Sequence, residues 1–67
     1  MTYQLKEIFS GGSVTAIALA ETVEEALAKV PGKIIACEEY PAAPDCWDVM
    51  SATRSAARQF TIEWLCP

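Results

Sequence analysis

The sequence predicts one small α+β domain spanning residues 1–67, with a single helix packed on a mainly antiparallel sheet. Three observations support this fold class. Five segments show the alternation or the β-rich composition of strands, one segment has the apolar spacing of a helix, and glycines or prolines interrupt the pattern between several of them. The expected order is strand, strand, helix, strand, strand, strand (ββαβββ), and the pattern leaves the strand order in the sheet open.

The first two strands are expected at residues 2–9 and 14–20, joined by a tight turn that contains Gly11 and Gly12. Adjacent glycines supply the positive φ angles of a two-residue hairpin loop. In the register that this turn implies, the cross-strand partners are Phe9 with Val14, Glu7 with Ala16, Leu5 with Ala18 and Tyr3 with Ala20. The other face of this hairpin is more apolar than a solvated face usually is, because it carries Ile8, Ile17 and Leu19.

The helix is expected to begin after Thr22, which forms a capping-box pattern with Glu25 three residues later. Glu25 can also pair with Lys29 one turn further along. Pro31 and Gly32 end the helix. Its apolar stripe is formed by Val23, Ala26, Leu27 and Val30.

The third strand is expected at residues 33–40, and the two prolines of the 41–45 segment cannot continue a strand ladder. The last two strands are expected at 46–52 and 59–65, with a turn over residues 53–56. This turn places Val49 opposite Phe60 and Trp47 opposite Ile62. The pairing register and the hydrophobic pattern therefore agree in the carboxy-terminal hairpin.

The residue types argue against catalysis. The chain has no histidine, so it lacks the usual general base and the commonest zinc ligand. Its three cysteines show no C-x-x-C spacing, so we expect no metal site and no cofactor. Free thiols that behave as small hydrophobic groups and a disulfide between Cys37 and Cys46 both remain open. A thiol-dependent enzyme is the least favoured alternative, because no activating neighbour is visible.

The net charge of −4 disfavours direct binding to DNA or RNA, which usually requires a basic surface. We therefore expect the aromatic residues Trp47, Phe60 and Trp64 to pack in the core rather than to stack on bases. The helix dipole accounts for the acidic residues near the helix start, which are Glu21, Glu24 and Glu25. A second acidic group, formed by Glu38, Glu39, Asp45 and Asp48, is either a solvated end of the sheet or a contact surface for a basic partner.

The composition predicts a cytoplasmic protein. No apolar run reaches the roughly 18 residues that a membrane span requires, and the amino terminus lacks the basic and apolar regions of a secretory signal. A domain of this size also has a thin stability margin and often gains from association. We therefore expect no membrane contact and consider self-association below.

Two functional hypotheses follow from size, charge and the missing catalytic groups. The first is a small acidic binding or inhibitor protein that occupies the surface of a protein partner. In its most specific form this is a phage- or mobile-element-encoded inhibitor of a host nucleic-acid-binding enzyme. The alternative is a structural or assembly subunit that homodimerises through the sheet face or a strand edge. The expected protein-binding residues are Glu38, Glu39, Asp45, Asp48, Ile8, Ile17 and Leu19.

Overall fold

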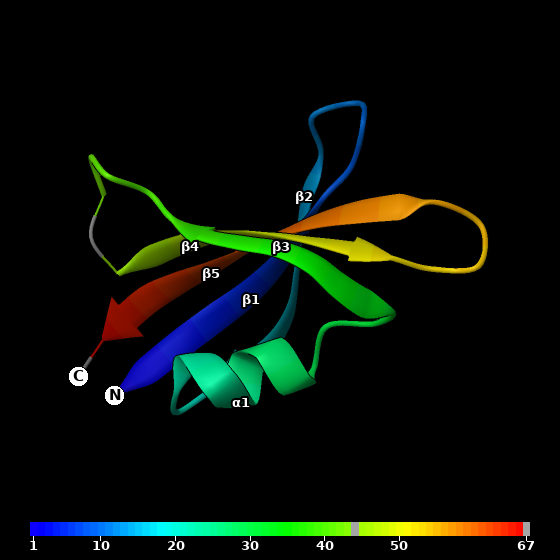
Figure 1. Cartoon of the computed structure of the whole chain (residues 1–67). Coiled ribbons are helices and arrows are strands. Elements are labelled where there is room, and N and C mark those ends of the chain that lie inside the picture. Colours follow the sequence, from blue (N-terminus) through cyan, green and yellow to red (C-terminus); the bar gives the residue numbers. More distant parts are fainter. Residues whose placement is uncertain (44, 67) are drawn as a thin grey trace.

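Figure 1 shows the computed structural model, which describes residues 1–43 and 45–66. In these residues five antiparallel strands form one sheet, and one short helix lies against it. This architecture agrees with the α+β class. The elements are β1 (Thr2–Ile8), β2 (Val14–Ala20), α1 (Val23–Ala28), β3 (Lys33–Glu39), β4 (Cys46–Ala52) and β5 (Ala57–Cys66).

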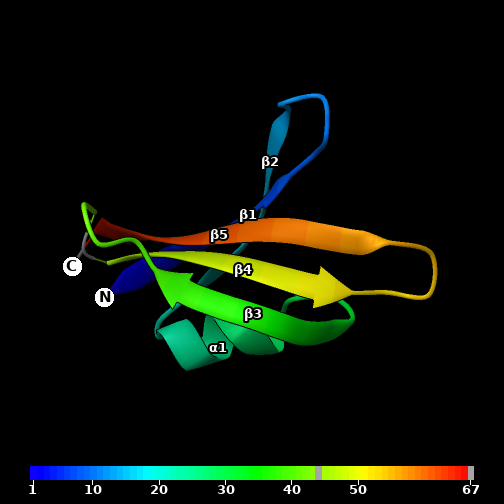
Figure 2. The same cartoon turned by 45° about the horizontal axis from the view of Figure 1, so that its top comes forward.

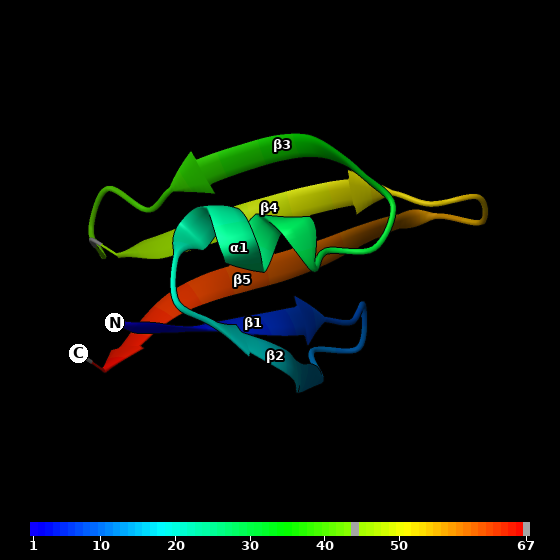
Figure 3. The same ribbon diagram turned by 90° about the horizontal axis from the view of Figure 1, so that it is seen from below.

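The strand order in the sheet, which the sequence left open, is β2-β1-β5-β4-β3. The first and last strands of this order, β2 and β3, are the two edges, and the chain passes from one edge to the other through α1. Figure 3 shows α1 lying across the sheet, and Figure 1 and Figure 2 show it on one side only. Within the described residues the opposite face of the sheet has no helix over it. We call this the open face.

The hydrophobic core lies between α1 and the central strands. Ala26 and Val30 of the expected apolar stripe are buried, and Val23 and Leu27 pack against the core from its margin. The sheet contributes side chains that are almost completely enclosed, namely Leu5, Val49, Phe60 and Ile62. Val23, Ala26 and Leu27 therefore form the face that α1 turns toward the sheet, whereas Val30 lies beyond the helix, which ends at Ala28 rather than just before Pro31.

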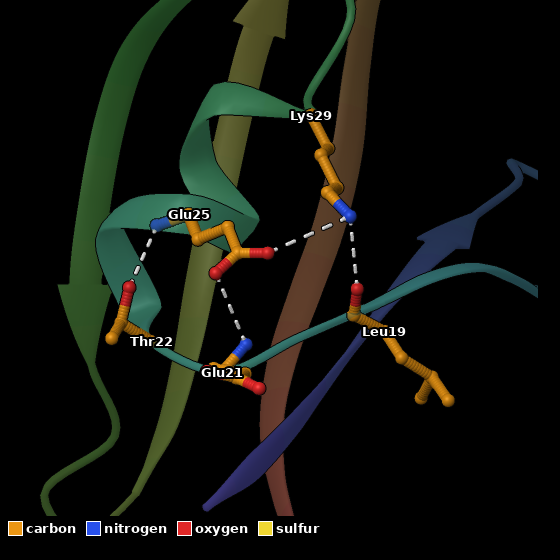
Figure 4. A network of polar contacts seen from close by, with 5 residues as sticks. All are labelled: Leu19, Glu21, Thr22, Glu25 and Lys29. Carbon is orange, nitrogen blue, oxygen red and sulfur yellow. Dashed lines mark hydrogen bonds and ion pairs between the residues drawn. The ribbon is translucent and has the colours of Figure 1, made fainter.

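The helix start has the expected cap. Thr22 Oγ1 accepts a hydrogen bond from the Glu25 backbone N–H at 3.0 Å, and a Glu25 carboxylate oxygen accepts one from the Glu21 N–H at 3.4 Å. Lys29 Nζ lies 3.9 Å from Glu25 Oε1 and donates to the Leu19 carbonyl at 3.0 Å. Figure 4 shows that these contacts link both ends of this short helix to the end of β2.

The carboxy-terminal hairpin confirms its predicted register. Val49 lies opposite Phe60 and Trp47 lies opposite Ile62, with no irregularity between β4 and β5. The predicted turn is also present, because the Thr53 backbone N–H donates to the Ala56 carbonyl at 2.9 Å. The one difference is length: β5 begins two residues earlier than expected and extends to Cys66.

The amino-terminal hairpin corrects two predictions. The Phe9 N–H donates to the Ser13 carbonyl at 2.8 Å and the Gly12 N–H donates to the Phe9 carbonyl at 2.9 Å, so the loop has three residues rather than two. Of the two loop glycines only Gly12 has a positive φ, 90°, as in a type I turn followed by a glycine bulge. Near the turn the partners are therefore shifted by one position: Ile8 with Val14 and Glu7 with Thr15.

A bulge restores the expected register further along the same hairpin. Lys6 lies opposite Ala16 but Leu5 lies opposite Ala18, which leaves Ile17 as the extra residue of β2. Beyond this point Leu5 and Tyr3 have the partners that the sequence predicts. The loop and the bulge thus introduce opposite shifts, and the buried end of the hairpin matches the prediction while the exposed end does not.

The other edge strand, β3, ends at Glu39, one residue before the predicted end. Its register on β4 shifts between Ile34 and Ala36, which makes Ile35 an extra residue. Pro44, in the loop that follows, lies outside the described residues. No helix in the described part of the chain has the length and hydrophobicity to cross a bilayer.

Candidate functional site

The centre of the open face is polar. Lys6 Nζ and Glu63 Oε1 form an ion pair at 2.6 Å across β1 and β5, and Gln59 Nε2 donates to Asp48 Oδ1 at 3.0 Å across β5 and β4. These side chains are only half-buried, so the centre is solvated rather than packed. Binding through this face would therefore combine polar contacts at the centre with apolar contacts at the margin.

The apolar margin lies along β2. Leu19 is 54% exposed and Ile17 is 43% exposed, whereas Ile8 of the neighbouring strand is half-buried. Leu19 lies opposite Gln4, and Ile17 is the extra residue of the bulge. Val14, which is 53% exposed, lies directly opposite Ile8, although the sequence analysis paired Val14 with Phe9. The shifted register thus adds Val14 to the three apolar residues that were expected here.

The four predicted acidic residues divide into two pairs rather than forming one surface. Glu38 and Asp48 are direct cross-strand partners of β3 and β4. Asp48 is adjacent in sequence to the buried Val49, so its side chain points away from α1, toward the open face. Two like charges in direct opposition repel each other. We call Glu38 and Asp48 the opposed carboxylates.

The second pair lies around the β3–β4 loop. Glu39 lies opposite Trp47, on the α1 side of the sheet, and its carboxylate accepts a hydrogen bond from the Asp45 backbone N–H at 3.2 Å. Asp45 has a φ of 64°, a left-handed conformation that aspartate tolerates better than most residues. The Asp45 carbonyl in turn accepts from the Trp64 N–H at 2.9 Å. Glu39 therefore has a structural role in shaping this loop.

A depression of about 510 Å³ opens beside the loop, at the end of the sheet where β1 begins. Its walls include two aromatic residues, Tyr3 and Trp47, whose rings meet edge to face with centroids 5.9 Å apart. Three carboxylates also line it, from Glu21, Glu24 and Asp45. Sequence analysis missed this grouping, because the residues come from three separate segments of the chain and the topology that joins them was unknown.

The most enclosed ion pair was also missed. Glu7 is buried on the α1 side, and Arg58 donates to it twice, from Nε to Oε2 at 2.7 Å and from Nη2 to Oε1 at 2.6 Å. The Arg58 guanidinium also lies 5.5 Å from the centre of the Phe60 ring. These hydrogen bonds hold the pKa of Glu7 below its ordinary value, against the opposing effect of burial. Two hydrogen bonds from a fixed guanidinium identify this pair as a structural contact between β1 and β5.

The two described thiols are free. Cys37 lies opposite Val49, three positions along β4 from Cys46, which corresponds to about 10 Å and exceeds the usual range for a disulfide. Partial burial and nearby carboxylates raise the pKa of both thiols. Such thiols are mainly protonated at neutral pH, which is the opposite of an activated nucleophile. The side chain of Cys66 lies outside the described residues.

The aromatic residues have different environments. Phe60 is in the core, Trp47 packs at its margin, and Trp64 is 40% exposed, so core packing accounts for the first two and not for the third. No group of three metal-binding side chains occurs within residues 1–43 and 45–66. Comparisons with protein-family models, curated proteins and solved structures found no match to this chain.

Proposed function

We propose that this chain is a small acidic cytoplasmic binding protein that occupies a basic surface of a protein partner through its open face. One observation carries the proposal: the opposed carboxylates, Glu38 and Asp48, face each other directly across β3 and β4. Their repulsion costs free energy in the isolated protein. A lysine or arginine from a partner would convert this cost into an attraction.

The apolar margin supplies the second part of the interface. Leu19 and Ile17 of β2, at the opposite edge of the same sheet, are 54% and 43% exposed. Protein interfaces combine such apolar contacts with charged contacts that fix orientation and accelerate association. A binding role, without catalysis, is also in keeping with a sequence that lacks histidine.

A more specific form of the proposal concerns what the partner does. A basic protein surface commonly binds nucleic acid. An acidic protein that covers such a surface would inhibit this binding. An inhibitor of a host nucleic-acid-binding enzyme, encoded by a phage or mobile element, has this chemistry. A net charge of −4 is small for complete mimicry of nucleic acid, so shape and apolar contact would have to contribute.

The proposal can be tested with charge-neutral and charge-preserving variants. The partner is first isolated by affinity purification from the host at low and high salt, and binding is then measured with the two purified proteins. We expect the Glu38→Gln/Asp48→Asn variant to bind about tenfold more weakly and to show a smaller dependence on salt. The matched Glu38→Asp/Asp48→Glu variant keeps both charges and should retain most of the affinity. Equal affinity of the neutral variant and the wild type would refute the role of the opposed carboxylates.

The alternative function is homodimerisation through the open face or an edge of the sheet. The observation that favours it is the exposed apolar margin on β2, which is itself an edge strand. Sedimentation velocity from micromolar to millimolar concentration measures the mass directly. A dimer that the Leu19→Glu variant dissociates would support this alternative, whereas a monomer at every concentration would eliminate it.

A further inference from the structure

We propose that the depression between the start of β1, the start of α1 and the β3–β4 loop binds an arginine side chain of a partner protein. This inference rests on the proposed function, because its occupant belongs to a basic partner. It adds a defined site on the α1 side of the sheet, distinct from the opposed carboxylates on the open face. Three features of the depression support it: its aromatic wall, its carboxylates and a tyrosine hydroxyl.

The aromatic wall is provided by Tyr3 and Trp47. Their rings pack at an interplanar angle of 66°, so each holds the other in place. Trp47 is only half-buried and therefore presents part of its indole to the depression. A guanidinium is planar and weakly hydrated, and it stacks on aromatic rings more readily than an ammonium does. The wall therefore favours arginine over lysine.

The carboxylates of Glu21, Glu24 and Asp45 supply the charge. Each is exposed, and no lysine or arginine of the described residues forms an ion pair with any of them. The neighbouring Glu25 differs, because it forms an ion pair with Lys29 and takes part in the helix cap. The positive end of α1 opposes a cation here, but this helix has six residues and Glu24 lies in its first turn. Met1, which carries the amino-terminal positive charge, also lines the depression, so three carboxylates outnumber one ammonium group and the local charge is negative.

Tyr3 provides an independent polar group. The residue is only 9% exposed and lines the depression, and its hydroxyl has no hydrogen-bond partner among the described residues. The hydroxyl oxygen itself is not enclosed, so it can accept a hydrogen bond from a group that enters the depression. A guanidinium carries five N–H donors, enough for the hydroxyl and for two carboxylates together.

The test uses the isolated protein and small probes, so it does not require the partner. Nα-acetyl-arginine amide is titrated against the Trp64→Phe variant, in which Trp47 is the remaining tryptophan and reports on the depression by its fluorescence. The matched control probe is Nα-acetyl-citrulline amide, which has nearly the same shape and no charge. We expect saturable binding of the arginine probe in the millimolar range and about tenfold weaker binding of the citrulline probe.

Variants then locate the binding. Glu21→Gln/Asp45→Asn should weaken binding of the arginine probe about tenfold, whereas Glu38→Gln/Asp48→Asn, with the same change in charge on the open face, should leave it unchanged. Circular dichroism checks that each variant is folded. Equal binding of both probes, equal loss in both variants, or tighter binding of Nα-acetyl-lysine amide would overturn the inference. If the arginine probe does not bind but the partner still does, this inference fails and the proposed function stands.

Discussion

The two hairpins of this protein differ in how firmly their sequences specify their registers. In the β4–β5 hairpin the partners agree with the alternation of large apolar residues from one end to the other. In the β1–β2 hairpin a three-residue loop and a bulge at Ile17 produce two shifts within seven residues. The physical difference lies in what a slip of one position would cost.

A slip in the β4–β5 hairpin would turn enclosed side chains such as Val49 and Phe60 toward the open face. In β2 only Ala20 belongs to the core, whereas the larger side chains, Ile17 and Leu19, are exposed, so a slip there would remove little apolar surface from the core. A register is therefore fixed where large side chains enter the core. Where no large side chain enters the core, the geometry of the turn determines the register.

The first prediction measures this difference directly. Phe60→Ala removes a fully enclosed ring and should lower the free energy of unfolding by about 3–5 kcal/mol, whereas Leu19→Ala in β2 should change it by less than about 0.5 kcal/mol. Urea denaturation of the purified variants measures both values. Because Phe60→Ala can leave so small a domain largely unfolded, Ile62→Val provides a milder test, with an expected loss of about 0.5–1.5 kcal/mol. Similar losses in the two hairpins would contradict the comparison.

The second prediction compares two glycines with positive φ. Gly12, at 90° in the β1–β2 loop, has open space where a side chain would go, so Gly12→Ala should cost only the backbone strain of about 1–2 kcal/mol. Gly32, at 83°, packs against the end of β4, and an added Cβ would lie 2.5 Å from the Ala52 carbonyl oxygen.

We therefore expect the Gly32→Ala variant to be the less stable of the two, since it combines the same strain with a clash against backbone. Thermal denaturation of both variants under identical conditions ranks them. The opposite ranking would show that the β1–β2 loop is more rigid than its open surroundings indicate.

Sequence patterns predicted the elements, the helix cap and the β4–β5 register, because each depends on contacts between neighbours in the chain or on burial of large residues. They could not give the sheet order, since the β1–β5 pairing joins residues more than fifty positions apart. The residues of the candidate site could not be grouped from the sequence for the same reason. Glu38 and Glu39 are adjacent in sequence but lie on opposite faces, and Tyr3, Trp47 and Glu24 meet only because of the topology. The sequence analysis therefore placed Glu39 and Asp48 on one surface. In the structure these two residues lie on opposite faces of the sheet.

The third prediction concerns the contact that joins the two hairpins. Hydrogen bonds from Arg58 lower the pKa of Glu7 below its ordinary value of 4.5. A carboxyl with a lowered pKa in the folded state stabilises that state when it is ionised. Its contribution is therefore complete above about pH 4.5 and is lost as the pH falls through the lower folded-state pKa. We expect Glu7→Gln to lower the free energy of unfolding at pH 7 and to flatten its dependence on pH in the acid range.

Denaturant titrations at a series of pH values compare this variant with Glu24→Gln, which removes an exposed carboxylate without a hydrogen-bond partner among the described side chains. The control should be close to the wild type at pH 7. A Glu7→Gln variant with the same acid dependence as the wild type would show that the Arg58 contact does not link stability to pH.

The last and smallest effect is expected from Ser51, a buried polar residue in the β4–β5 hairpin. Its side chain is fully enclosed, and its Oγ has no hydrogen-bond partner among the described residues. Burying a hydroxyl without a partner costs free energy, so Ser51→Ala should raise the free energy of unfolding by up to about 1 kcal/mol. Ser13→Ala, beside the exposed loop of the β1–β2 hairpin, should stay within about 0.5 kcal/mol of the wild type. If Ser51→Ala is instead destabilising, the hydroxyl is satisfied in solution, and the β4–β5 hairpin is specified by a polar contact as well as by its apolar register.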